Sequence, residues 1–136
     1  GRMCTGGRCC DACSRVQLRR VAGEEECARM VALASMLMPP PEEHTQSNLY
    51  LKLTAAAGDV GGHLLYVRLV ERMRRVVAFE YGLPLEAVTP KQTFVSRITS
   101  EADPEDYSIV HSDEQSTRAY HYSCVLYLSE SSDFEG

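Results

Sequence analysis

The sequence predicts an α+β fold in which two amphipathic helices come first and a run of strands follows. Apolar residues recur at helical spacing over residues 24–38 and 63–81, whereas residues 91–128 alternate as strands do. Helices that lead into successive strands favour packing on one side of a largely antiparallel sheet. The 136 residues are 44% hydrophobic and 24% charged, which suits a single domain with a real core.

The first helix is expected over residues 24–38. Glu24, Glu25 and Glu26 occupy its first turn, where the helix dipole favours negative charge. Three consecutive prolines at 39–41 end it, because proline lacks the amide hydrogen. The apolar stripe expected to face the core is Cys27, Met30, Val31, Ala34, Leu37 and Met38.

The second helix is expected over residues 63–81, after a polar connection and a flexible break at 58–62. Glu71 and Arg75 are spaced as a favourable i,i+4 pair, and Gly82 followed by Pro84 stops the helix. Arg72, Arg74 and Arg75 are expected on a solvated face. The apolar stripe is Tyr66, Leu69, Val70, Met73, Val76 and Val77.

Strands are expected over residues 92–98, 107–111 and 120–128, with polar loops at 99–106 and 112–119. Successive side chains of a strand point to opposite faces. The face suited to packing on helices presents Tyr122, Cys124, Leu126 and Leu128. The more polar face, suited to lining a cavity, presents His121, Ser123, Val125 and Tyr127.

Residues 1–22 form an irregular, Cys-rich lead-in to the domain at 23–136. Four of the six cysteines lie there, namely Cys4, Cys9, Cys10 and Cys13. Disulfides, free thiols and a metal site all remain open, and a small zinc module fused to a helical domain is one alternative. Disulfides would place the protein in the secretory pathway, the endoplasmic reticulum or the endomembrane system.

Charge and hydropathy exclude two classes of partner. The net charge of −5 argues against nucleic acid, because binding to phosphates usually requires a basic patch. No apolar run in the sequence is long enough to cross a membrane.

His111-Ser112-Asp113 is the motif with the clearest chemistry. Residues two apart on a strand share a face, so one imidazole and one carboxylate can converge on a single ion. With a second histidine from elsewhere, they form the facial triad of non-haem iron(II) oxygenases, which leaves coordination positions open. A thiol nucleophile at Cys124 is disfavoured, because His121 lies three residues away and points to the opposite face.

The order of motifs after residue 107 resembles the prolyl 4-hydroxylase-like dioxygenases that use iron(II) and 2-oxoglutarate. His111-x-Asp113 is followed by a variable loop, a strand ending Tyr127-Leu128-Ser129, and the acidic, aromatic Asp133-Phe134-Glu135-Gly136. Family members more often have Asn where Ser129 stands. The upstream segments 81–85 and 93–98 are also similar, especially to the 2-oxoglutarate and iron-dependent oxygenase domain-containing proteins. The similarity spans residue 64 to the end.

The resemblance implies a double-stranded β-helix (jelly-roll) core, incomplete in this chain, with the two helices as support. It implies that His111 and Asp113 bind iron, that Tyr127 binds the carboxylate of 2-oxoglutarate, and that Tyr107 lines the pocket. The family's second histidine and its basic 2-oxoglutarate anchor would follow Gly136, so the fragment alone is expected to be inactive. The remaining histidines, His44, His63 and His121, are poor substitutes.

The implied activity is hydroxylation of a protein or peptide substrate with release of succinate and carbon dioxide. Iron(II), 2-oxoglutarate, dioxygen and L-ascorbate are the implied cofactors and co-substrates. A peptidyl proline is the family's best-known target. The alternative is a non-catalytic scaffold that keeps the sheet as a binding module.

Overall fold

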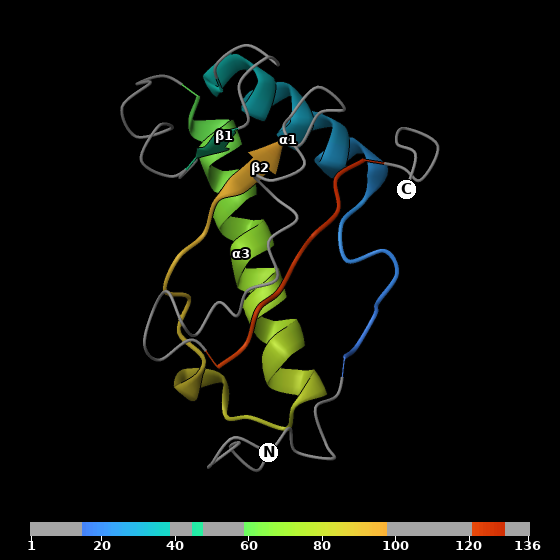
Figure 1. Cartoon of the computed structure of the whole chain (residues 1–136), viewed down its shortest axis with the longest axis vertical. Coiled ribbons are helices and arrows are strands. Elements are labelled where there is room, and N and C mark those ends of the chain that lie inside the picture. The colour runs from blue at the N-terminus through green and yellow to red at the C-terminus, as the bar shows by residue number, and fades with distance from the viewer. Residues whose placement is uncertain (1–14, 39–44, 48–58, 98–120, 130–136) are drawn as a thin grey trace, which may run out of the picture.

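The computed structural model describes residues 15–38, 45–47, 59–97 and 121–129. The elements in chain order are α1 (Glu24–Leu37), β1 (Thr45–Ser47), α3 (Val60–Glu80), the 3₁₀ helix η1 (Leu85–Ala87) and β2 (Val95–Arg97). Helix α3 is the long central element, and α1 lies across its N-terminal end (Figure 1). Both helices expected from the sequence are confirmed.

The core lies where α1 crosses α3. Met30 and Leu33 from α1 meet Tyr66 and Leu69 from α3, and each is at most 6% exposed. The stripe predicted for α3 is confirmed at Tyr66, Leu69 and Val77. The stripe predicted for α1 is confirmed at Met30 and Ala34 but was wrong at Val31, which is 41% exposed, and it missed Leu33. A helix that crosses its partner buries one narrow face, which excludes residues at the edge of the stripe.

The flexible break predicted at residues 58–62 was wrong, because α3 already begins at Val60. The Asp59 carboxylate caps the helix and accepts a hydrogen bond from the Gly62 amide at 2.8 Å. A Cβ added to Gly62 would lie 2.8 Å from Leu33 Cδ1. This glycine therefore permits the close approach of α1 to α3.

Exchanging the two glycines of this turn for alanine should have opposite effects on stability. Both substitutions improve helix propensity by about 1 kcal/mol. At Gly62 the new methyl would lie 2.6 Å from Asp59 Oδ2 and 2.8 Å from the buried Leu33, and overpacking costs about 1–3 kcal/mol. At Gly61 its one close contact is the end of the Arg29 side chain at 2.6 Å, which can swing away, whereas Asp59 Oδ1 lies at an ordinary 3.5 Å. Urea denaturation should show Gly61→Ala as the more stable variant; equal stabilisation by both would contradict this packing.

The end of α3 is a Schellman motif, as Gly82 predicted. Gly82 has φ +61°, which suits a residue without Cβ. The amide of Leu83 donates to Ala78 O at 2.8 Å, and the amide of Gly82 donates to Phe79 O at 3.2 Å. The chain therefore reverses sharply and returns along the helix.

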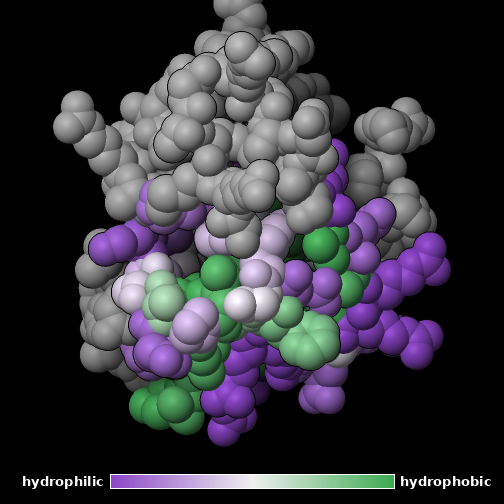
Figure 2. All heavy atoms as spheres, turned by 90° about the horizontal axis from the view of Figure 1, so that it is seen from below, coloured by the Kyte–Doolittle hydropathy of each residue, from purple (hydrophilic) through white to green (hydrophobic). Residues whose placement is uncertain are grey.

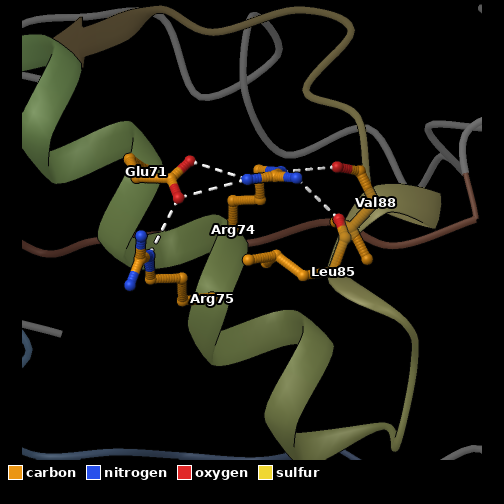
Figure 3. A network of polar contacts seen from close by, with 5 residues as sticks. All are labelled: Glu71, Arg74, Arg75, Leu85 and Val88. Atoms are coloured by element: carbon orange, nitrogen blue, oxygen red, sulfur yellow. Dashed lines mark hydrogen bonds and ion pairs between the residues drawn. The ribbon is translucent and has the colours of Figure 1, made fainter.

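Arg74 holds this returning segment against α3, as Figure 3 shows. Its guanidinium donates to the carbonyls of Val88 and Leu85, both at 2.7 Å, and to both carboxylate oxygens of Glu71. Glu71 also pairs with Arg75 at 2.8 Å, which confirms the predicted i,i+4 pair. The side chain of Arg74 is 22% exposed, whereas that of Arg75 is 68% exposed. The solvated face predicted for all three arginines was therefore wrong for Arg74.

Arg74→Met should destabilise the protein by about 1–3 kcal/mol, because two carbonyls and a carboxylate lose a charged donor. Arg75→Met should change stability by less than about 1 kcal/mol, because exposed ion pairs contribute little. Chemical denaturation followed by circular dichroism measures both. Equal losses for the two variants would show that Arg74 does not hold the segment.

Two short strands form an antiparallel pair beside α3 (Figure 1). Thr45 pairs with Arg97 and Ser47 with Val95. Strand β1 was not expected, because Thr-Gln-Ser has no apolar alternation and its pairing rests on backbone hydrogen bonds. The strand predicted at 92–98 is confirmed at Val95–Arg97, whereas 92–94 is irregular.

The other predicted strands are tested only in part. The strand at 107–111 and the loops at 99–106 and 112–119 lie outside the described residues. The strand predicted at 120–128 was wrong over the described residues 121–128, which follow an extended path along α3 but do not form a strand (Figure 1). The jelly-roll core stays a prediction.

Candidate functional site

The extended segment 121–128 contains the predicted site residue that the structure describes. Its aromatic and aliphatic residues alternate between two environments. Leu126 and Leu128 pack against the core between the helices, and the Tyr122 ring lies 4.7 Å from the Tyr81 ring, centroid to centroid. Tyr127 is 77% exposed and Val125 is 71% exposed. The two-faced character predicted for this segment is thus confirmed at Leu126 and Leu128 but was wrong at Tyr122, which is 41% exposed, and at Cys124, which is also exposed.

The remaining predicted ligands cannot be placed next to Tyr127. His111, Asp113 and Tyr107 lie outside the described residues, as do His44, Cys4, Cys9, Cys10 and Cys13. Of the histidines judged poor ligands, His63 lies in the first turn of α3 and His121 is exposed on the extended segment. The described residues contain no group of three or more metal-ligating side chains.

Cys27 and Cys124 are free thiols on the walls of one hollow. Burial raises the pKa of both thiols, and the nearby Glu26 carboxylate raises that of Cys27 further. Both sulfurs are therefore protonated near neutral pH. A thiolate nucleophile at Cys124 is disfavoured on this ground as well as by strand geometry.

The hollow has a volume of about 200 Å³ and lies between the lead-in, the two helices and the extended segment. Val16 and Leu18 come from the lead-in, Met73 and Val76 from α3, and Leu126 from the extended segment. Sequence reasoning missed it, because the position of an irregular segment against α3 is not encoded in local periodicity. The one available signal was the apolar pair Val16-x-Leu18 within an otherwise polar stretch.

The ion pair between Glu26 of α1 and Arg72 of α3 joins the two helices, and both side chains also bind the backbone just before α1. Two hydrogen bonds of 2.7 and 2.9 Å join the carboxylate of Glu26 to the guanidinium of Arg72. Arg72 also donates to Val21 O at 2.8 Å, and Glu26 accepts from the Gly23 amide at 3.0 Å. Arg72 is thus a tertiary contact that the sequence did not predict, although its side chain is 40% exposed, in keeping with the predicted solvated face.

The Glu26–Arg72 pair should make stability sensitive to acid. The hydrogen bonds from Arg72, and then that from Gly23, lower the pKa of Glu26 from 4.5 to about 2. A lowered folded-state pKa stabilises the protein above the unfolded pKa and ceases to do so as pH falls toward 2. The melting temperature of the unmodified chain should exceed that of Glu26→Gln at pH 7, and the gap should close between pH 4.5 and pH 2. A gap independent of pH would exclude this role for the ionised pair.

No protein-family model, curated protein or solved structure matches the chain. Among the described residues, no helix is long and apolar enough to span a membrane.

Proposed function

We propose that this chain is the front part of an iron(II)- and 2-oxoglutarate-dependent dioxygenase of the prolyl 4-hydroxylase type. The proposal rests on the order in which motifs follow one another along the chain. A His111-x-Asp113 pair precedes a two-faced extended segment ending in Tyr127-Leu128, and an acidic stretch with Phe134 and Gly136 follows. One imidazole and one carboxylate supply two of the three ligands of a facial triad.

The described residues support the proposal through the orientation of Tyr127. A segment that lines a catalytic pocket must fix its apolar side chains on one face and leave the other face accessible. Leu126 and Leu128 are held against the helical core, while the ring of Tyr127 is exposed. Its hydroxyl is therefore available to donate a hydrogen bond to a carboxylate.

Iron(II) bound at this site would supply the oxidative chemistry that consumes 2-oxoglutarate and dioxygen. The balanced reaction converts a C–H bond of the substrate to C–OH while 2-oxoglutarate becomes succinate and carbon dioxide. The residues of this chain bind and orient: His111 and Asp113 would hold the metal, and Tyr127 would hold the co-substrate. Tyr107 would line the same pocket. The substrate proposed on the resemblance is a protein or peptide, with L-ascorbate keeping the metal reduced.

Binding of 2-oxoglutarate to the protein encoded by the complete transcript tests this function. Manganese(II) replaces iron(II), so that the complex can be studied by calorimetry without turnover. Tyr127→Phe should weaken binding about tenfold or more, because a hydrogen bond to a charged group contributes about 1.5–3 kcal/mol. Tyr122→Phe is the matched control, since its ring packs on Tyr81. Absence of metal-dependent 2-oxoglutarate binding in the unmodified protein would overturn the proposal.

A further inference from the structure

Arg20 borders the 200 Å³ hollow in an unusual backbone conformation. Its φ of 61° lies in the left-handed region, which a side chain with a Cβ rarely adopts. Residues in such conformations persist where their surroundings fix them, often beside ligands. Within the described part of the chain, its guanidinium makes no hydrogen bond or ion pair, whereas Arg72 and Arg74 each bind a carboxylate.

The walls around Arg20 are mostly apolar. Leu18, Met73 and Val76 offer hydrocarbon, and Arg20 is the one charged residue among the described residues of the lining. Residues 16–22 and 124–127 both contribute to the lining of the hollow, together with Cys27 of α1 and Met73 and Val76 of α3. Seen from the C-terminal end of α3, apolar side chains gather among hydrophilic ones on the molecule's surface (Figure 2). Arg20 is exposed and lies at the rim of the hollow. A cation at the rim of an apolar hollow complements an anion with an apolar body.

We propose that this hollow binds a small aliphatic carboxylate, with its hydrocarbon chain against Leu18, Met73 and Val76 and its carboxylate on Arg20. Several residues of the walls are exposed, so the hollow is open and its volume does not fix the length of the ligand. Octanoate, with one carboxylate and an unbranched hydrocarbon chain, is the probe. The proposal needs no iron, although Tyr127, the residue proposed to hold 2-oxoglutarate, also lines this hollow.

Calorimetric titration of the full chain with octanoate, without added metal, tests this site. Affinity should rise with each methylene from butanoate to octanoate, by at most about fourfold per methylene. Octanamide, which has the same chain and no charge, should bind about tenfold more weakly. Arg20→Asn should cause a similar loss, because asparagine tolerates the left-handed conformation. Arg19→Asn should bind as the unmodified chain does, and Arg20→Lys should retain part of the affinity.

The two thiols report where the ligand lies. Cys27 and Cys124 line the hollow, so octanoate should slow their reaction with iodoacetamide, measured peptide by peptide. Without added metal, the strongly hydrophilic 2-oxoglutarate should leave these rates unchanged, so protection by octanoate would not depend on the proposed iron site, although Tyr127 borders both. No saturable octanoate binding, equal affinity in Arg20→Asn, or unprotected thiols would each overturn the proposal.

Discussion

Replacing His111 by alanine is expected to abolish iron(II) binding by the protein encoded by the complete transcript. A facial triad holds the metal through three protein ligands, and loss of its imidazole leaves at most one carboxylate and one histidine. Loss of residues that merely orient ligands already lowers metal affinity by about 10–100-fold, so loss of a ligand should exceed about 100-fold. Metal content after dialysis against a weak chelator measures the change. Succinate formation from 2-oxoglutarate should fall with it.

His121→Ala is the control for this experiment. His121 is exposed on the extended segment and lies outside the proposed triad, so its variant should keep its metal. Equal loss of iron from both variants would point to a general loss of structure. Full retention of iron by His111→Ala would remove His111 from the site.

Leu69→Ala should lower the free energy of unfolding by about 2–5 kcal/mol. Leu69 is 4% exposed and belongs to the cluster in which α1 crosses α3. Truncation removes buried hydrocarbon and leaves a cavity that the helices cannot fully close. Domains of this size are stable by only about 5–15 kcal/mol, so the loss is a large part of the total. Urea denaturation followed by circular dichroism measures it.

Leu64→Ala is the matched control on the same helix. Leu64 is 46% exposed, so its truncation should cost less than about 1 kcal/mol. If Leu64→Ala were as damaging as Leu69→Ala, the face of α3 that packs on α1 would have been misassigned.

The helices were predictable because their signals are local. The 3.6-residue spacing of Tyr66, Leu69 and Val77 identifies the buried face of α3, and Gly82 marks its end. The start of α3 was mispredicted for a tertiary reason. Glycines at 61 and 62 read locally as a break, yet Gly62 is required by the proximity of Leu33, which belongs to another helix.

The arginines of α3 also differ in whether the local sequence predicts their contacts. The pair formed by Glu71 and Arg75 follows from spacing along one helix. The contact between Arg72 and Glu26 joins residues 46 positions apart, and no local pattern encodes it. The hollow beside Arg20 also could not be predicted locally, because segments far apart in the sequence line it, namely residues 16–22, α3 and residues 124–127.

Of the candidate site, the alternation was predictable only at the end of residues 121–128, where Leu126 and Leu128 are packed and Tyr127 is exposed, as a period of two requires. Tyr122 and Cys124 share the predicted packed face but are exposed, because packing on the helices is a tertiary contact that local alternation does not encode. The convergence of His111 and Asp113 on one ion stays a prediction, since both residues lie outside the described part of the chain.

Sequencing the source transcript beyond the codon for Gly136 tests the proposed dioxygenase most directly. The expected result is a glycine-rich strand followed by a histidine, with an arginine or lysine a short distance beyond it. These residues would complete the triad with His111 and Asp113 and would anchor the second carboxylate of 2-oxoglutarate. A stop codon after Gly136, or a continuation without that histidine, would contradict an iron site built on His111 and Asp113.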